Sequence, residues 1–295
     1  MIDQHTDEWY ELRRTGIGGS DAAAVLGESR WKTPYKVWRE KVFGERDPDN
    51  KSFEAGRRLE PIIREWYVDE TGQKVVVPGF MRDKHYPFLC GNVDGLTDDK
   101  VIEIKTARFN DWGDTPPNAY VLQCQHYLLL TGKNSADLVV LFAGQDFKVY
   151  SIDHNPALQT TMLQYYYQFW QYVESKTPPP PQTLDDLKLM FPASKNDTKT
   201  LSPKAIAAYE TLIEKKKTLV DIETDIDALE FQIKSELGEF DTGVNSDGKV
   251  LCTWKTSKPR QTLDAARLKT EEPGIYNSYL KQGNVSRTFL LKEIK

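Results

Sequence analysis

Cysteine is scarce in this chain, and that scarcity limits the protein classes it can belong to. The 295 residues include three cysteines, Cys90, Cys124 and Cys252, which lie far apart and form no CxxC pair. A disulfide framework, a structural zinc site or an iron–sulfur cluster needs more cysteines or closer spacing. The four histidines form no ligand pattern either. We therefore expect a protein of a reducing compartment, without cysteine-bound metal.

Long hydrophobic runs and an excess of basic charge are also absent. No stretch approaches the roughly 20 apolar residues of a membrane span, and the N-terminal MIDQHTDEWY has no signal-peptide pattern. We expect a cytoplasmic protein with no membrane partner. The net charge is −5, whereas nucleic-acid-binding domains are usually basic. This balance disfavours a protein that coats nucleic acid and suits one that grips it locally, since a cleft can concentrate positive charge.

A proline-rich segment divides the chain. Residues 177–181 read Thr-Pro-Pro-Pro-Pro, and polar residues continue to about Ser202. Proline runs form stiff, extended spacers. We expect a first domain over 1–176, a linker or arm over 177–202, and a C-terminal module over 203–295. An aromatic-rich stretch over 160–172 is predicted to be a helix packed on the first domain, with base stacking as the alternative.

The C-terminal module is predicted to begin with a long helix over 203–240. Ser202 and Pro203 form a typical helix start. Apolar residues then recur at nearly heptad spacing, which suits a helical hairpin or a coiled-coil partner; they are Leu212, Leu219, Ile222, Ile226, Leu229, Ile233 and Leu237. Residues 203–240 hold five lysines against nine acidic residues, and residues 241–295 hold ten basic against six acidic. Beyond the helix, residues 245–249 predict a turn between two short strands.

The most informative residues are Asp94, Glu103 and Lys105. The apolar run over 101–104 is broken only by Glu103 and predicts a strand. Side chains alternate along a strand, so Glu103 and Lys105 share one face. The turn residues over 95–100 predict a hairpin that brings Asp94 beside Glu103. Two carboxylates and an amine at one sheet edge suit a divalent metal bound through oxygens. The alternative is an ordinary Asp-Gly turn followed by a solvated Glu-x-Lys surface, because short motifs are often coincidental.

Gly18-Gly19-Ser20-Asp21 precedes the helix-forming run over 22–26. Ser20 or Asp21 is expected to cap that helix, whose free N–H groups would favour an anion. Arg13 and Arg14, just upstream, would add donors for a phosphate. A plain capped helix after a glycine turn is the alternative.

Two further helical segments carry polar candidates. Glu60 flanks a predicted buried stripe and could be an ordinary surface residue; the stripe consists of Leu59, Ile62, Ile63, Trp66 and Tyr67. Pro61, next to it, predicts a kink or a helix start. Gln125 lies on a helical run over 120–130, where it could simply bond the backbone; Gln123 is a weaker candidate on another helix face. His126 is expected to be packed or solvated.

These blocks, in order, resemble one known family. Asp94, Glu103 and Lys105 are similar to the PD-(D/E)xK nuclease signature, with Val93-Asp94 in place of Pro-Asp. The blocks over 9–21, 56–61 and 120–127 complete a resemblance to the lambda exonuclease and YqaJ-type viral recombinase family over about residues 5–175. The resemblance implies an α/β, restriction-endonuclease-like fold, with a mixed central sheet flanked by helices and a helical plus small β appendage.

The resemblance also implies roles for the candidate residues. Asp94, Glu103 and the Ile104 carbonyl would hold one or two Mg²⁺ ions, with Mn²⁺ also possible, and Glu60 would reach the metal directly or through water. Lys105 would position the attacking water, with Gln125 bordering the site. Arg13 and Ser20 would hold a DNA 5′-phosphate.

The implied activity is digestion of one strand of linear double-stranded DNA from its 5′ end, for phage-type recombination. Expected partners are double-stranded DNA ends, two further copies in a homotrimer ring, and a single-strand annealing protein, within a bacterial host. The alternatives are a PD-(D/E)xK endonuclease, a RecB-like single-strand nuclease, and a non-catalytic DNA-binding module.

Overall fold

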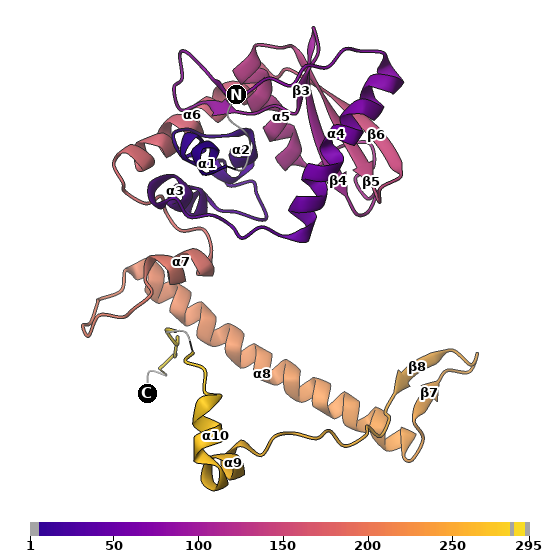
Figure 1. Ribbon diagram of the computed structural model, residues 1–295. Coiled ribbons are helices and arrows are strands. Elements are labelled where there is room, and N and C mark those ends of the chain that lie inside the picture. The colour runs from indigo at the N-terminus through magenta and orange to yellow at the C-terminus, as the bar shows by residue number, and fades with distance from the viewer. Residues whose placement is uncertain (1–5, 284–285, 293–295) are drawn as a thin grey trace. The chain divides into compact units, whose positions relative to one another are not determined.

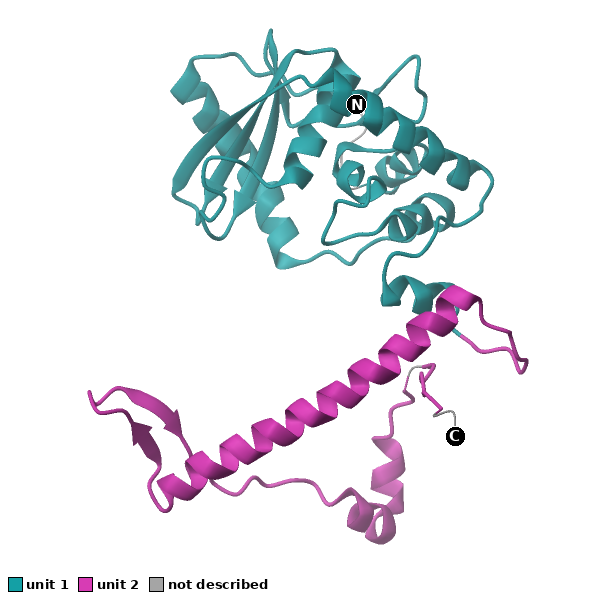
Figure 2. Ribbon diagram, turned by 180° about the vertical axis from the view of Figure 1, so that it is seen from behind, with its two compact units in different colours: residues 1–192 teal, residues 193–295 magenta. Residues whose placement is uncertain are grey.

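The computed structural model describes residues 6–283 and 286–292. They divide into two compact units, residues 1–192 and 193–295 (Figure 2). The first unit holds α1 (Asp7–Arg14), η1 (Gly19–Asp21), α2 (Ala22–Val25), α3 (Pro34–Phe43), α4 (Lys51–Thr71), β1 (Met81–Arg82), β2 (Cys90–Gly91), β3 (Gly95–Leu96), β4 (Lys100–Ala107), α5 (Asn118–Thr131), β5 (Ser135–Phe142), β6 (Asp146–Asp153), α6 (Pro156–Glu174) and α7 (Leu184–Met190).

A mixed sheet in the order β3-β4-β5-β6 is the centre of the first unit (Figure 1). Strand β4 runs parallel to β5, and the other two pairings are antiparallel. Helix α5 makes the crossover between the two parallel strands, as a parallel pair requires. The predicted α/β class, with a mixed central sheet flanked by helices, is confirmed.

Both faces of the sheet are buried. Alternate residues of β4 and β5 enter different clusters, as strand geometry dictates. Val101 and Leu138 belong to the larger cluster, with residues of α2, α5 and α6. Ile102 and Ile104 belong to the smaller one, with Ile63 and Tyr67 of α4. Glu103 is therefore carried on the α5 side of the sheet.

Helix α4 shows how packing overrides a local signal. It begins at Asn50, whose Oδ1 accepts hydrogen bonds from the backbone N–H groups of Ser52 and Phe53. It continues through Pro61 to Thr71 without ending there, because Ile63 and Tyr67 bury its inner face completely. The predicted stripe is correct at these two residues and wrong at Ile62, which is 55% exposed.

The segment expected to be a linker contains helix α7, which belongs to the first unit. Asp186 on α7 is fully buried and accepts a 2.7 Å hydrogen bond from the Thr33 hydroxyl. It also accepts hydrogen bonds from the backbone N–H groups of Gln182 and Thr183. The proline run is thus followed by an anchored helix, and the boundary between the units falls at residue 192.

The second unit consists of α8 (Pro203–Leu237), β7 (Thr242–Val244), β8 (Val250–Thr253), α9 (Ala265–Glu271) and α10 (Pro273–Ser278). The predicted helix start is confirmed, since Ser202 Oγ accepts from the Ala205 backbone N–H at 3.3 Å. Gly238, at a φ of 56°, ends the helix. Strands β7 and β8 form the predicted hairpin. Within the described residues, no helix is long and apolar enough to cross a membrane.

Candidate active site

The β3–β4 hairpin brings Asp94 to the middle of β4. Gly95 pairs with Ile102, and the turn is closed by a 3.0 Å hydrogen bond from the Thr97 N–H to the Lys100 carbonyl. Asp94, just before β3, accepts a 2.8 Å hydrogen bond at Oδ2 from the backbone N–H of Ile104. The predicted hairpin and its approach to Glu103 are confirmed.

Glu103 is a buried carboxylate with one oxygen unsatisfied. It is 1% exposed, and its Oε1 accepts from Lys105 Nζ and, at 2.6 Å, from Gln123 Nε2. Its Oε2 has no hydrogen-bond partner among the described residues. Burial, and then the nearby Asp94, raise the pKa of Glu103 to about 8, although Lys105 opposes the shift. A buried oxygen without a partner is costly, so this atom suits an additional cation.

Lys105 supplies the positive charge of the site. Burial acts to lower the pKa of Lys105, but the adjacent Glu103 and Asp94 outweigh it and raise that pKa. The ammonium also lies 5.7 Å from the centre of the Tyr120 ring. Lys105 is therefore held charged beside two carboxylates.

Glu60 approaches the same place from α4. Its carboxylate pairs with Arg64, and Arg64 Nε donates a 2.8 Å hydrogen bond to the backbone carbonyl of Asp94. Burial, and then the charge of Asp94, raise the pKa of Glu60. Glu60 is thus a neighbour of the carboxylates, engaged by Arg64 in this structure.

The oxygen atoms of this site bear on whether it can hold a divalent ion. Within the described part of the chain, no three His, Cys, Asp or Glu side chains form a cluster that could hold a metal. Asp94 and Glu103 are two: burial raises the pKa of Asp94, and burial together with the charge of Asp94 raises the pKa of Glu103. Oxygen ligands that repel one another are what a hard cation neutralises. The residues therefore fit a divalent ion held by Asp94 and Glu103, with the Ile104 carbonyl and Glu60 remaining predictions.

Gln125 does not border the active site, so that prediction is wrong. It lies away from Glu103: its Nε2 donates a 2.6 Å hydrogen bond to the Asp153 carbonyl, and its Oε1 accepts from the Asn155 N–H and Gln159 Nε2. It therefore fastens α5 to the end of β6 and the start of α6. Gln123, the weaker candidate, contacts Glu103. Side chains two positions apart on an α-helix point about 200° apart, so Gln123 and Gln125 lie on different faces of α5. Because α5 is buried on nearly all sides, the sequence pattern could not show which of these faces carries the active site.

Arg13 and Ser20 are brought together as predicted. Arg13 Nη2 donates to Ser20 Oγ at 2.8 Å and to Asp21 Oδ1 at 3.3 Å. Ser20 is exposed and the Arg13 side chain is 28% exposed, so both can meet a ligand. Arg14 does not join them, because its guanidinium pairs with Glu11 and donates to the carbonyls of Lys41 and Val42.

Asp21 and Lys41, which hold Arg13 beside Ser20, were not predicted from the sequence to do so. Asp21 is buried, and its Oδ2 accepts from Lys41 Nζ at 2.6 Å and from the Gly18 N–H at 3.0 Å. Burial acts to raise the pKa of Asp21, but Lys41 and Arg13 hold it well below its usual range. Asp21 therefore orients Arg13 and does not cap α2 with its side chain. No sequence signal marked Lys41, because it comes from the distant helix α3.

Tyr127 links the two groups of residues. A Cβ on Gly19 would lie 2.4 Å from Tyr127 Cζ, and one on Gly91 would lie 2.9 Å from Tyr127 Cε1. The Tyr127 side chain lies next to Gln123, which hydrogen-bonds Glu103. Glycine is required at both positions for the ring to fit. One aromatic ring thus spans from η1, which carries Ser20, to the carboxylate site.

His126 takes no part in the site. It is fully buried, with its ring nitrogens 2.9 Å from the Tyr166 hydroxyl and from the Cys90 carbonyl. Burial lowers the pKa of His126 to about 4. It is a packed, neutral histidine, as expected from the sequence.

Comparison with known proteins shows what the first part of the chain is similar to. Residues 8–134 match the model of the YqaJ-like viral recombinase domain. The matched range includes Arg13, Ser20, Glu60, Asp94, Glu103, Lys105, Gln123 and Tyr127. The YqaJ protein of Bacillus subtilis (strain 168) is 28% identical over 312 aligned positions, which cover 98% of this chain and 94% of that protein.

Solved structures share the fold of the first unit. The alkaline exonuclease LHK-Exo from Laribacter hongkongensis is 24% identical, with a TM-score of 0.51 over 58% of this chain and 94% of that one. A structure of LHK-Exo in complex with dAMP gives a TM-score of 0.50, at 24% identity, over 63% of this chain and 97% of that one. The sheet and its flanking helices are thus shared with that enzyme.

Proposed function

We propose that this chain is a metal-dependent nuclease that digests one strand of linear double-stranded DNA from its 5′ end. The observation that carries the proposal is the buried pair Asp94 and Glu103, with an unsatisfied Glu103 oxygen beside Lys105. The exposed Arg13–Ser20 pair, which the Tyr127 ring connects to these carboxylates, also supports the proposal. The shared fold with LHK-Exo, described as an alkaline exonuclease, supports a nuclease.

Asp94 and Glu103 would hold Mg²⁺, with Mn²⁺ equally suited to oxygen ligands. The Ile104 carbonyl and, through water, Glu60 would complete the set. When bound, the ion supplies positive charge to the scissile phosphate and favours the deprotonation of water. Metal loading requires Glu103 ionised, and the pKa of that carboxyl near 8 favours alkaline conditions.

The chain's own residues hold and orient the reacting groups. The Lys105 ammonium would stabilise charge that develops on the phosphate and would position the attacking water. Gln123 fixes Glu103 through its 2.6 Å hydrogen bond, so the carboxylate is oriented before substrate arrives. These roles need no group from the second unit.

Arg13 and Ser20 would bind the 5′-phosphate at the DNA end. A guanidinium and a hydroxyl 2.8 Å apart present convergent donors, and guanidinium–phosphate hydrogen bonds are among the strong ones. Each cleavage leaves a new 5′-phosphate on the shortened strand, so the same pair can engage after every step. This accounts for an enzyme that acts from an end.

The biological setting follows from this activity. A 5′-to-3′ resection leaves a 3′ single strand, the substrate of a single-strand annealing protein. We propose that the chain acts with such a protein in phage-type recombination in the bacterial cytoplasm. A homotrimeric ring around the DNA is proposed with it, since a ring would keep the enzyme on one substrate.

The decisive experiment is digestion of linear duplex DNA labelled separately at each strand end, with and without Mg²⁺. Substrates with 5′-phosphate and 5′-hydroxyl ends, a closed circle, and a single strand are compared in parallel. Lys105→Ala should abolish cleavage. Lys100→Ala should retain it, because Lys100, at the start of β4, binds Asp137 of β5 and is not part of the site. The expected result is Mg²⁺-dependent release of mononucleotides from the 5′-phosphorylated strand.

Other outcomes discriminate between the rivals. Cutting of the closed circle would replace the end-dependent enzyme by an endonuclease, and degradation of the single strand alone would favour a RecB-like nuclease. Failure to cleave any substrate in Mg²⁺ or Mn²⁺, by a folded protein that still binds DNA, would leave a non-catalytic binding module.

A further inference from the structure

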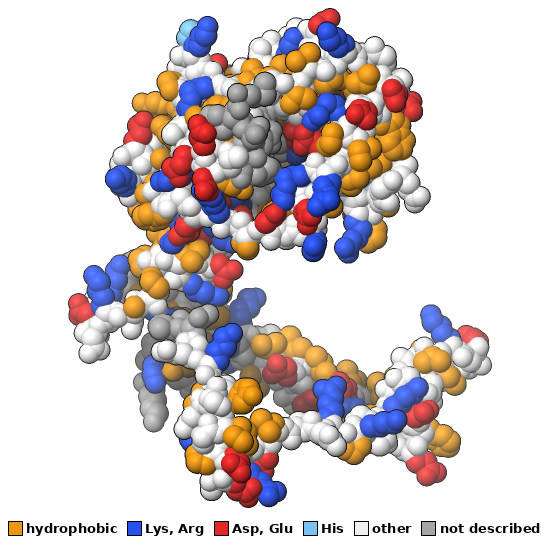
Figure 3. All heavy atoms as spheres, viewed as in Figure 1, with side chains coloured by type: hydrophobic (Ala, Val, Ile, Leu, Met, Phe, Trp, Pro, Cys, Tyr) orange, Lys and Arg blue, Asp and Glu red, His pale blue; other side chains and the backbone are white. Residues whose placement is uncertain are grey.

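Helix α8 exposes an apolar seam along most of its length. Leu212, Leu219, Ile222, Ile226, Leu229 and Ile233 are between 36% and 59% exposed. In the 35 residues of α8, only Leu237 is buried. Figure 3 shows hydrophobic side chains at the surface along this helix. An isolated helix of this kind gains most of its stability from packing of its apolar stripe, so the seam requires an occupant.

The seam has strict heptad positions. Leu212, Leu219, Ile226 and Ile233 are seven residues apart and take position a. Ile222 and Leu229 take position d, three residues after an a position; Lys215 occupies the preceding d position and Glu236 the following one. Alternation of a and d is the pattern of a coiled coil.

The charged residues in the middle of α8 form two blocks. Lys215, Lys216 and Lys217 form a basic block, and the acidic side chains of Asp221, Glu223, Asp225, Asp227 and Glu230 follow it. Val220, the central residue of α8, lies between the blocks. A second copy of the helix in the opposite direction would therefore place each basic block beside an acidic block.

We propose that α8 pairs with α8 of a second copy of this chain as an antiparallel coiled coil. In antiparallel coils, a positions pack against d positions. One such register places Leu212 against Leu229 of the second copy, Leu219 against Ile222, and Ile226 against Lys215. It is centred between residues 220 and 221, where the charge blocks require the centre to be. The apolar pattern thus restricts the alignment to steps of one heptad, and the charge blocks select this register among them.

The flanking positions agree with this register. Lys216 and Glu223 both occupy position e, and the alignment places Lys216 of each copy beside Glu223 of the other. Two such pairs form in each dimer. The Lys215 stem can extend along Ile226 while its ammonium reaches solvent and the acidic block.

A parallel pairing in register is disfavoured by the same residues. It would place Lys215 against Lys215 at a core position, and acidic block against acidic block. Like charges that are close together destabilise a pairing, and a polar residue at a core position fixes alignment. Charge complementarity therefore argues for the antiparallel arrangement.

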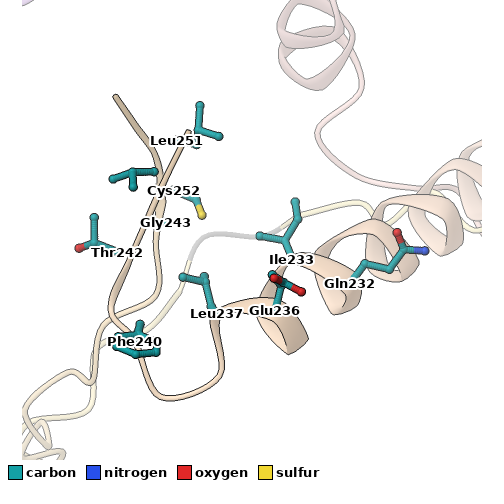
Figure 4. A pocket seen from close by; sticks show the side chains of 10 residues that line it. Gln232, Ile233, Glu236, Leu237, Phe240, Thr242, Gly243, Leu251 and Cys252 are labelled. Atoms are coloured by element: carbon teal, nitrogen blue, oxygen red, sulfur yellow. The ribbon is translucent and has the colours of Figure 1, made fainter. Parts of the chain in front are cut away.

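The groove at the C-terminal end of α8 fits this occupant. It has a volume of about 460 Å³ and is lined by Ile233 and Leu237 of the helix and by Leu251 and Cys252 of β8 (Figure 4). Ile233 belongs to both the groove and the seam. The register places Ala205 and Ala208 of the second copy at this end, and their small side chains leave room beside the β7–β8 hairpin.

The test is the mass of the full-length protein by sedimentation equilibrium. Leu219→Asp is compared with Val220→Asp, because these neighbours are 52% and 59% exposed but only Leu219 lies in the seam. We expect the wild type and Val220→Asp to have twice the mass of Leu219→Asp, because α8 then joins two copies whose first units are monomeric, or two of the proposed three-membered rings. Equal masses for all three proteins would overturn the proposal and would assign the seam to another partner.

Charge reversal then tests the direction of pairing. Lys216→Glu and Glu223→Lys should each weaken self-association about tenfold, because two pairs per dimer change from attraction to repulsion. The double variant should return to within about twofold of the wild type. Lys217→Glu, on the outer face, is the control. In a parallel coil Lys216 and Glu223 do not meet, so unchanged association in both single variants would refute the antiparallel pairing.

Discussion

Replacing Glu103 by Gln should stabilise the metal-free protein increasingly as pH rises. The folded state holds the Glu103 carboxyl protonated up to a pKa of about 8, against an ordinary value of 4.5. Between these values the folded chain binds more protons than the unfolded chain. Wild-type stability must then fall as pH rises through this window. Glutamine keeps the shape of the side chain and removes the titration.

The size of the effect follows from the pKa shift. One pKa unit corresponds to about 1.4 kcal/mol, so between pH 5 and pH 8 the wild type should lose up to ~4 kcal/mol relative to Glu103→Gln. Glu103→Gln also weakens the contact with Lys105, which changes the free energy of unfolding by a roughly constant amount at each pH. The prediction therefore concerns how the difference in free energy of unfolding between wild type and variant changes with pH.

The assay is urea unfolding in EDTA at pH 5, 6, 7 and 8, followed by tryptophan fluorescence, since six of the seven tryptophans lie in residues 1–192. Asp137→Asn is the matched control. Asp137 is also buried on the sheet, at 4% exposure, but both its oxygens are bound by Tyr67 and Lys100. That variant should lose stability at every pH.

Added Mg²⁺ completes the test. It should restore the stability that the wild type loses at pH 8, because an ion that binds the folded protein and not the unfolded chain stabilises the folded state. It should leave Glu103→Gln almost unchanged. A difference in free energy of unfolding between wild type and variant that stays constant from pH 5 to pH 8 would show that ionised Glu103 does not destabilise the metal-free protein, and would refute this reasoning.

Two further predictions concern residues that the structure separates. Gln123→Ala should lower kcat by about 10- to 100-fold through loss of Glu103 orientation, whereas Gln125→Ala should cost about 1–3 kcal/mol of stability with little loss of kcat in the folded fraction; full activity of Gln123→Ala would contradict this assignment. Arg13→Ala should reduce the ratio of kcat/KM for 5′-phosphate over 5′-hydroxyl ends at least tenfold, and Arg14→Ala should preserve it. An unchanged ratio in Arg13→Ala would remove the phosphate role.

The sequence was sufficient where a local pattern decides the structure. Asp94 and Glu103 meet because a short polar turn joins two strands, and Lys105 follows by strand alternation. Arg13 and Ser20 are seven residues apart around a glycine turn. In each case few residues separate the partners, so turn and strand rules place them.

The sequence was insufficient where distant elements decide. Lys41 reaches Asp21 from another helix, and no local rule predicts a contact across α2, the loop that follows it and most of α3. Gln123 and Gln125 are both almost completely buried, so the usual contrast between an apolar and a polar helix face is missing. Asp186 anchors α7 within a stretch whose prolines indicated only a spacer. Tertiary packing determined these three results.

The ring of Tyr127 has a consequence for how this protein can vary. It fills the space that side chains at Gly19 and Gly91 would need, so the three positions form a single steric unit drawn from three separate stretches of chain. An alanine at either glycine can be accommodated only if residue 127 becomes smaller at the same time. Such a pair of changes would also cut the link between Gln123 and η1. Natural variants should therefore keep all three residues or replace them jointly, leaving a covarying triplet that an alignment can reveal.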